Sequence, residues 1–239
     1  MALSTYIDGI NQALKEEMRR DEKVYIIGED VGAMGGAFKA TKDLLDEFGE
    51  GRVIDSPLAE GIIVSSSIGA ALTGMRPVPE IQFSDFITPA FDAITQQAAK
   101  LRYRSAGTQT CPFTLRVCYG GGVQGGLYHS QTNTTWFAHE PGLRVVAPST
   151  VHDAKGMLKA AIRADDPVIY FEHKKLYRSI KEDLPVWSGA LVTAALPDAS
   201  IVAKSVAAAN AGECAGVDVS VGGASSSKIA AENGCSETL

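Results

Sequence analysis

The residues that could carry chemistry in this chain are a few acidic and histidine side chains at the ends of apolar runs. Glu60, in the segment DSPLAEG, follows one such run and precedes a stretch of small apolar residues. His129, in LYHSQ, follows the glycine-rich segment 120–126. Taken alone, Glu60 is best explained as a surface carboxylate at a helix N-terminus, where negative charge is favourable. A lone histidine is more often structural than catalytic, so its place in the fold must decide its role.

The glycine-rich segments do not match the common nucleotide-binding loops. Residues 120–126 have glycines at the GxGxxG spacing but lie far from the first predicted strand, where a nucleotide- or flavin-binding domain would carry that loop, and they lack a terminal GK[ST]. The segment 28–36 lies at that place in the chain, but it lacks the pattern. The chain has no GxSxG and no HExxH, and its four cysteines are not in a metal-ligand spacing. A nucleotide- or flavin-binding domain is therefore the least favoured interpretation.

Apolar runs and helix-length stretches alternate along the first 180 residues. Residues 5–20 have apolar side chains at three- and four-residue spacing, which predicts an amphipathic helix. The apolar runs do not alternate with polar residues, which is typical of parallel strands covered on both faces. We therefore expect an α/β layered fold with right-handed crossovers. The expected strands are 24–30, 52–57, 76–83, 113–120, 143–149 and 167–173, and the further helices are 60–74, 88–104 with Thr88 as N-cap, and 150–164 with Ser149 or Thr150 as cap.

Polar and glycine-rich segments follow the predicted strands. In an open parallel sheet, ligands bind beyond the carboxyl ends of the strands. Four segments fall at this edge: 28–36, 56–61, 82–86 and 119–131. Since loops on a rigid scaffold carry chemistry more often than the core does, this edge is the expected functional site.

The overall composition excludes several kinds of partner. The net charge of −6 argues against a nucleic acid or an anionic membrane as the main partner. No apolar run is long enough to span a bilayer, and the N-terminus lacks the pattern of a signal peptide. With free thiols as the expected state of the four cysteines, we expect a cytoplasmic protein.

The last 52 residues differ from the rest. From Ser188 to Leu239, 27 residues are Ala, Ser or Gly, and no aromatic residue occurs after Trp187. Such a stretch can bury little large apolar surface against the entropy of ordering it. We expect residues 188–239 to be poorly ordered or weakly folded.

The order of several motifs resembles one enzyme family. The motifs are GEDVG, DSPLAEG, GMRPVPEIQFSDF, AAKLRYRS, GGGVQGGLYHSQ and DDPVIYFEHKKLYR. They resemble the β subunits of the thiamine-diphosphate-dependent decarboxylating component of 2-oxo acid dehydrogenase complexes. The likeness is strongest to the branched-chain enzymes, and pyruvate and acetoin dehydrogenase β subunits are near relatives. It implies a transketolase-like pyrimidine-binding domain over residues 4–184, in an oxidoreductase that decarboxylates a 2-oxo acid and passes the acyl group to a lipoyl group.

The resemblance also implies roles for single residues. Glu60 corresponds to the glutamate that binds the ring nitrogen of the cofactor's aminopyrimidine, and Phe86 to an aromatic residue that packs on that ring. His129 corresponds to an active-site histidine that orients or donates protons during acyl transfer. Glu29 corresponds to a buried acid near the cofactor, with a possible place in a proton relay. Two further positions are expected to bind the cofactor, Leu58 and Gln82.

Partners and metals follow from what the family needs and this sequence lacks. The family holds the diphosphate through Mg²⁺ on a GDG motif, and no GDG occurs here. The resemblance therefore implies an α subunit that supplies Mg²⁺ and half of the cofactor site in a heterotetramer, which serves a lipoyl-bearing acyltransferase core. The similarity ends near Leu184, so we expect the second domain of the family to be missing. The alternative is a truncated, catalytically silent chain that only binds an α partner.

Some members of the family bind a structural potassium ion, mostly through backbone carbonyls. The family often has Asp where this chain has Ala164. The matching positions are Phe113, Thr114, Ala161, Ile162, Ala164 and Asp166.

Overall fold

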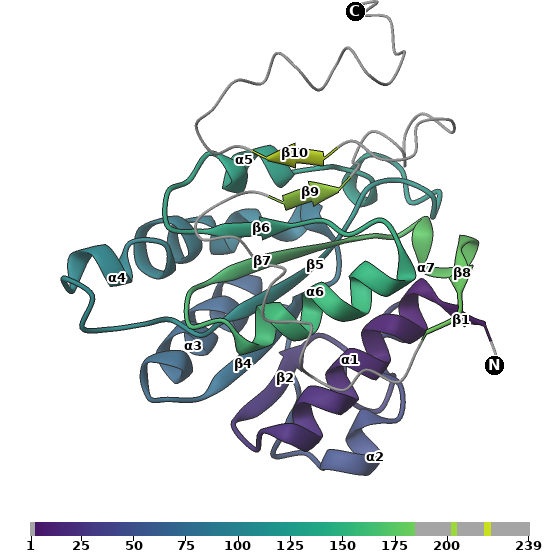
Figure 1. Ribbon diagram of the computed structural model, residues 1–239, viewed down its shortest axis with the longest axis horizontal. Helices are drawn as coiled ribbons and strands as arrows, with labels where there is room; N and C mark the ends of the chain where they lie inside the picture. The colour runs from purple at the N-terminus through teal and green to yellow at the C-terminus, as the bar shows by residue number, and fades with distance from the viewer. Residues whose placement is uncertain (1–2, 185–201, 205–217, 221–239) are drawn as a thin grey trace, which may run out of the picture.

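The computed structural model describes residues 3–184, 202–204 and 218–220. Six parallel strands form the centre of the fold, in the order β3-β2-β4-β5-β7-β6 (Figure 1). Each expected strand is present, which confirms the predicted parallel α/β sheet. The strands are β2 (Val24–Gly28), β3 (Val53–Asp55), β4 (Arg76–Ile81), β5 (Thr114–Tyr119), β6 (Arg144–Val146) and β7 (Val168–His173).

Two further strands extend the sheet beyond β6. β9 (Val202–Lys204) pairs parallel to β6, and β10 (Asp218–Ser220) pairs antiparallel to β9. They are the part of the region 188–239 that the structure describes. The remainder of that region lies outside the described residues, so the expectation of a poorly ordered tail stays a prediction.

Helices cover both faces of the sheet. In Figure 1, α1 and α6 lie in front of it, and α3 and the helical segments that follow lie behind it. The N-caps of the front helices are side chains: Thr5 forms a capping box with Asp8, and Thr150 accepts the amide of Asp153. The α-helices are α1 (Tyr6–Arg20), α2 (Leu44–Phe48), α3 (Glu60–Leu72), α4 (Leu101–Arg104), α5 (Thr134–Ala138), α6 (Val151–Arg163) and α7 (Leu176–Ser179).

The stretch 88–104 is not the single α-helix that the sequence predicts. It consists of a 3₁₀ turn, η2 (Thr88–Ala90), a π-helical segment, η3 (Ala93–Ala98), and the short α4. The prediction of Thr88 as N-cap is wrong. Ile87, directly before Thr88, already has helical backbone angles because another 3₁₀ turn, η1 (Ser84–Phe86), runs into it, so the extended backbone of a capping residue is absent.

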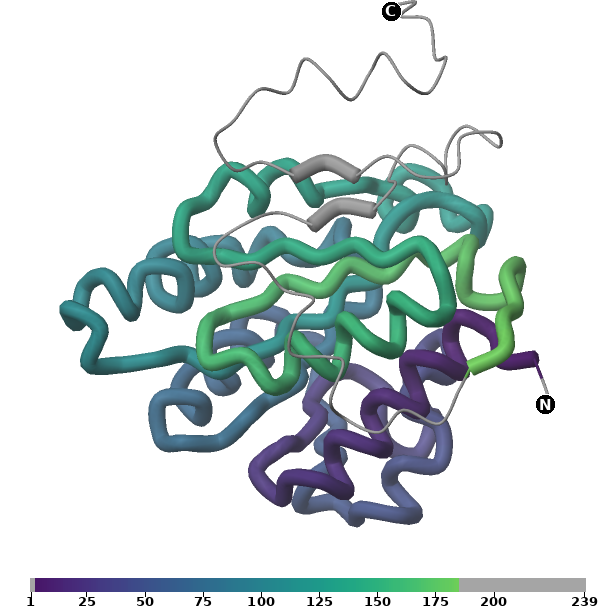
Figure 2. The backbone as a smooth tube through the Cα atoms, viewed as in Figure 1, coloured from purple at the N-terminus to yellow at the C-terminus, as the bar shows by residue number. Residues whose placement is uncertain are grey.

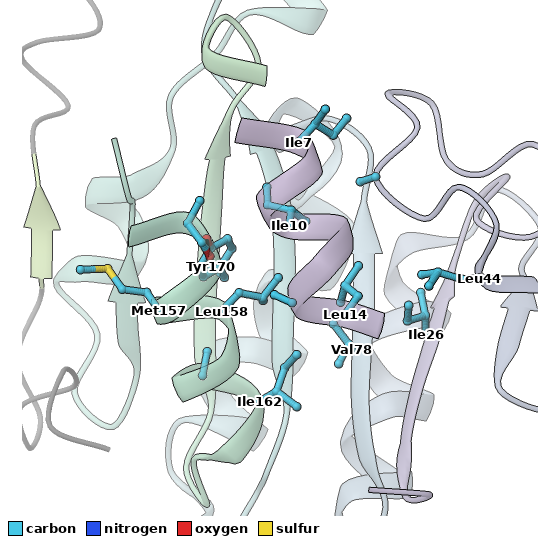
Figure 3. Close-up of a cluster of buried hydrophobic side chains, with 14 of the residues drawn as sticks. Ile7, Ile10, Leu14, Ile26, Leu44, Val78, Met157, Leu158, Ile162 and Tyr170 are labelled. Carbon is cyan, nitrogen blue, oxygen red and sulfur yellow. Dashed lines mark hydrogen bonds between the residues drawn. The ribbon is translucent and has the colours of Figure 1, made fainter. Parts of the chain in front are cut away.

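The front core holds α1 and α6 against the sheet. Figure 3 shows Ile10 and Leu14 of α1 meeting Leu158 and Ile162 of α6 above the strands. Ile10, Leu14 and Leu158 are fully buried. Each such side chain contributes roughly 1.5–3 kcal/mol through burial. This packing makes the sheet a rigid support for the loops at its ends.

The two ends of the described segment 3–184 meet. β1 (Ser4–Thr5) pairs antiparallel with β8 (Lys181–Glu182), and Figure 2 shows the start of α1 beside the segment that ends the domain. No helix within the described residues is long and apolar enough to cross a membrane.

Candidate functional site

Glu29 lies at the carboxyl edge of the sheet, directly after β2. Its side chain is 6% exposed, and its Oε1 atom has no hydrogen-bond partner among the described residues. Gln82, which follows β4, donates its Nε2 hydrogen to the backbone carbonyl of Glu29 at 2.9 Å. Two residues predicted for the site are thus joined across neighbouring strands.

Negative charges surround Glu29. Burial, together with the charges of Glu60, Asp30 and Glu80, raises the pKa of Glu29 to about 7. Glu60 therefore lies within electrostatic reach of Glu29, as the sequence analysis expects. A carboxyl group with this pKa exchanges protons near neutral pH, which is typical of a functional site.

Glu60 is the first residue of α3 and is half-buried. The N-cap residue, Ala59, offers no side chain to the helix end, so the helix N-terminus and the Glu60 carboxylate favour each other. Glu60 therefore has the helix-terminal role that the sequence alone indicates. The structure adds that the charge of this carboxylate acts on Glu29, a buried acid at the carboxyl edge of the sheet.

An aromatic cluster flanks the acids. The rings of Phe83 and His129 are 4.6 Å apart, and the ring of Phe86 lies 5.9 Å from Phe83 and 5.5 Å from His129, with all three pairs edge to face. The structure thus brings together Phe86 and His129, as predicted. The sequence analysis missed Phe83, which links the two and whose position two residues after the end of β4 was the available signal.

His129 is held in one orientation. It ends the 3₁₀ turn η4 (Leu127–His129), and its Nδ1 atom lies 3.1 Å from the carbonyl oxygen of Gly125. A neutral ring with its proton on Nδ1 donates to that carbonyl and leaves Nε2 as an acceptor. A Cβ atom on Gly125 would stand 2.5 Å from the Cβ of His129, so only glycine fits there.

The residues after His129 are anchored to η1. The amides of Ser130 and Gln131 donate to one carboxylate oxygen of Asp85, each at 3.3 Å. Ser84 donates its hydroxyl to the carbonyl of Gln131 at 2.8 Å, and Asn133 donates to the carbonyl of Ser84 at 2.8 Å. The segment that directly follows His129 is therefore hydrogen-bonded to η1, the turn that carries Phe86.

Leu58 does not line the interior of this site. Its side chain is 83% exposed on the segment before α3. Other large apolar side chains on the neighbouring loops and the first turn of α3 are also exposed: Met34, Ile62, Leu127 and Tyr128. These five side chains lie on segments that follow β2, β3 and β5, and large exposed apolar side chains gathered in one region are typical of a surface that another molecule covers.

The positions predicted for potassium lie at the opposite end of the sheet, and their polar groups are already engaged. The Arg76 guanidinium donates to the carbonyls of Ile162 and Ala164 at 3.1 and 3.0 Å. It also pairs with Asp165. The carbonyl of Phe113 accepts the amide of Val168, and the carbonyl of Ala161 accepts the amide of Ala164. Thr114 is buried where β5 pairs with β7. Asp166 forms an ion pair with Arg102. Because the Arg76 guanidinium already supplies positive charge to the carbonyls of Ile162 and Ala164, the predicted residues do not fit a second cation.

Below the site lies a buried ionic network that the sequence analysis missed. Arg116 is fully buried and donates to Glu172 and to Glu80. The hydroxyl of Tyr177 donates to Glu172 at 2.7 Å. Burial lowers the pKa of Arg116, but the charges of both glutamates more than offset this and hold it well above its ordinary value. The network fixes β4, β5 and β7, whose ends carry the site.

Comparison with protein families matches residues 4–180 to the family described as Transketolase, pyrimidine binding domain. The chain belongs to this family. It is a family of thiamine-diphosphate-dependent enzymes, and the parallel sheet described above is its pyrimidine-binding fold.

Curated proteins that resemble the chain carry two related names. The chain is 57% identical over 185 residues to the 2-oxoisovalerate dehydrogenase subunit beta of Bacillus subtilis (strain 168), covering 77% of this chain and 57% of that protein. It is 49% identical, with the same coverage, to the pyruvate dehydrogenase E1 component subunit beta of Staphylococcus epidermidis. The chain thus spans little more than half the length of these relatives.

A solved structure supports the fold alone. It is described as "Split gene transketolase, inactive beta4 tetramer", and it matches with a TM-score of 0.58 at 16% identity, over 77% of this chain and 54% of that one.

Proposed function

We propose that this chain is part of the β subunit of a thiamine-diphosphate-dependent 2-oxo acid dehydrogenase. The proposed reaction is oxidative decarboxylation of a branched-chain 2-oxo acid, with transfer of the acyl group to a lipoyl group. One observation carries the proposal: the relative named for 2-oxoisovalerate is 57% identical across the domain that assembles Glu29, Glu60, Phe86 and His129 at one edge. The 49% identity to the relative named for pyruvate is lower.

The residues at this edge fit the aminopyrimidine end of thiamine diphosphate. Glu29 is a buried carboxyl group without a partner, beside a second carboxylate on Glu60. A buried carboxyl group that holds a proton near neutral pH, beside a second carboxylate, suits a basic ring nitrogen. The faces and edges of Phe83 and Phe86 suit a flat ring. When bound, the cofactor would supply the nucleophilic carbon for the decarboxylation.

The residues of this chain divide the remaining work. Glu60 holds the proton at the ring nitrogen, and Glu29 keeps a further proton nearby because its pKa is raised to about 7. Phe86 supports the ring and excludes water. His129 keeps Nε2 as an acceptor, since its Nδ1 is engaged by the carbonyl of Gly125. Through Nε2 it orients the group being transferred, and it protonates that group only after Nε2 has itself taken up a proton.

A second chain completes the proposed site. This sequence contains no GDG motif for the Mg²⁺-diphosphate end. The exposed apolar side chains of Leu58 and Ile62 flank Glu60 in the chain. An α subunit that covers these side chains would bring Mg²⁺ and close the site, in a heterotetramer that serves a lipoyl-bearing acyltransferase core.

Two alternatives stay open. The likeness to the pyruvate enzymes supports a pyruvate or acetoin dehydrogenase β subunit instead. The other alternative is a chain that binds an α partner without turnover.

Co-expression with the α subunit of a branched-chain enzyme tests all three. We expect the chains to co-purify and, with thiamine diphosphate and Mg²⁺, to decarboxylate branched-chain 2-oxo acids with a higher kcat/KM than pyruvate. The Glu60→Gln complex is the inactive control. Preference for pyruvate would overturn the substrate, co-purification without turnover would overturn the activity, and no co-purification would overturn the assembly.

A further inference from the structure

Lys174 is a buried cation that the proposed function does not use. It directly follows β7 and is 4% exposed. Its Nζ atom forms no hydrogen bond with any described residue, and it lies 5.2 Å from the centre of the Phe83 ring. An ammonium group over an aromatic face is attracted by the ring, but that contact does not replace a hydrogen bond.

Asp85 has the matching deficit. One of its carboxylate oxygens receives the amides of Ser130 and Gln131, and the other, Oδ2, is buried without a partner in the described part of the chain. No ion pair of ordinary length joins it to Lys174, yet the two interact through their charges.

Asp85 carries the negative charge that opposes the effect of burial on the pKa of Lys174. Burial lowers the pKa of Lys174, and negative charge on Cys118 and on Asp85 opposes this shift. Burial also holds the pKa of Cys118 well above its ordinary value, so its thiol is neutral near pH 7. Asp85 is then the anion that stabilises the Lys174 ammonium.

The ring that Lys174 contacts and the carboxylate whose charge acts on it both lead to His129. The Phe83 ring that lies under the ammonium touches the His129 ring, with their centres 4.6 Å apart. The Asp85 carboxylate holds the two amides that directly follow His129. We propose that Lys174 is a positioning residue for His129, acting through the Phe83 ring on one side and the Asp85 carboxylate on the other.

The first test needs neither cofactor nor partner. In the full chain labelled with ¹⁵N-histidine, a His129→Gln variant identifies the His129 ring signals. We expect the parent to show Nδ1 protonated, as the Gly125 contact requires. Lys174→Met removes the charge at similar size, and we expect His129 to change to a mixture of ring forms. Asp85→Asn weakens the same anchor and is expected to change the signals in the same way.

Lys155→Met is the matched control. Lys155 is also a buried lysine, at 2% exposure, but it lies on α6 and bonds to Gln12 and Glu16 away from the site. This variant should lower the melting temperature and leave the His129 signals unchanged. If Lys174→Met and Asp85→Asn both leave those signals unchanged, Lys174 is only a buried lysine and the inference fails. Asp85→Asn decides the question if Lys174→Met does not fold.

The second test is kinetic, and it rests on the proposed function. In the complex with an α subunit, Lys174→Met should lower kcat by roughly 10–100-fold with little change in KM, because a small displacement of a catalytic group acts on the chemical step. An unchanged kcat would contradict the role in turnover. If the parent complex has no activity, the proposed function fails, while the ring signals of the free chain still decide the role of Lys174.

Discussion

The α1–α6 packing surface and the carboxyl edge of the sheet both bury charged groups, but they differ in how those groups are paired. Between the helices, Glu17 is fully buried and bonds to Arg163 at 2.6 Å. Lys155 and Lys159, both nearly buried, share the carboxylate of Glu16. Each of these charges thus meets a partner of opposite sign.

The carboxyl edge leaves charges unpaired. Four buried side-chain atoms lack a hydrogen bond within the described residues. One belongs to Glu140, which forms an ion pair with Lys100. The other three belong to Glu29, Asp85 and Lys174, each after a parallel strand. Since an unpaired buried charge costs stability, this contrast locates the region of the molecule that is arranged for something other than stability.

Glu60→Gln should separate the two regions most sharply. Glutamine keeps the size but cannot hold a transferable proton, so turnover of the assembled complex should fall by roughly 10²–10⁴-fold. Exchange of the cofactor's thiazolium proton with deuterated solvent measures the affected step. Glu16→Gln, on the α1–α6 packing surface, is the control and should retain turnover. A mutant at Glu60 that exchanges the proton at the parent rate would return Glu60 to the simple helix-terminal role.

Glu17→Ala should have the largest effect on stability. It removes the buried carboxylate that Arg163 and Arg20 share, and breaking such a pair destabilises a protein by about 2–4 kcal/mol where the remaining cations can reach water. Urea unfolding followed by circular dichroism measures the change. The ring signals of His129 in the folded variant should match the parent. Altered signals would mean that the two regions are coupled, contrary to the comparison.

Glu29→Gln should stabilise the chain, but only at higher pH. The pKa of Glu29 is about 7 in the folded chain against 4.5 as its ordinary value. The folded state therefore binds the proton more tightly, and stability is lost as pH rises from about 4.5 through about 7. Glutamine removes this loss, so the variant should gain roughly 1–3 kcal/mol at pH 8 and almost nothing at pH 4.5. Unfolding at the two pH values tests this, and an equal gain at both would contradict a charged origin.

Removing potassium should have the smallest effect. Arg76 already donates to the carbonyls of Ile162 and Ala164, so replacing potassium by choline should leave the melting temperature of the chain within experimental scatter. Arg76→Met should then lower the melting temperature and, if those carbonyls can hold a cation, make it depend on potassium. A potassium-dependent melting temperature in the parent would show that the site binds the ion beside Arg76.

The sheet and the outline of the site were predictable because strand ends fix positions in space. The six apolar runs identify the strands, and the polar segments after them place Glu29, Gln82 and His129 at one edge. By contrast, the irregular helix over 88–104 depends on η1, a turn whose geometry leaves no periodic pattern. The short helices α2, α5 and α7 escaped prediction for the same reason.

Single buried charges were harder to predict. In FEHKKLYR, Lys174 and Lys175 look like equivalent surface residues, yet Lys174 is buried and Lys175 is not. They differ only in that Lys174 directly follows the last residue of β7 and Lys175 lies one residue further on. Arg76 likewise resembles an ordinary residue at the start of a strand, and its contact with α6 joins segments 86 residues apart. Such long-range pairs are set by tertiary packing and leave no trace in local spacing.

The pairing of β5 with β7 has a consequence for how this domain can change over time. The two strands match residue for residue from Thr114 opposite Val168 to Tyr119 opposite His173. A one-residue insertion within β7 would turn every later side chain to the other face. It would move Lys174 away from the site while Asp165 stayed with Arg76. Insertions and deletions are therefore expected in the loops that flank this strand and not within it.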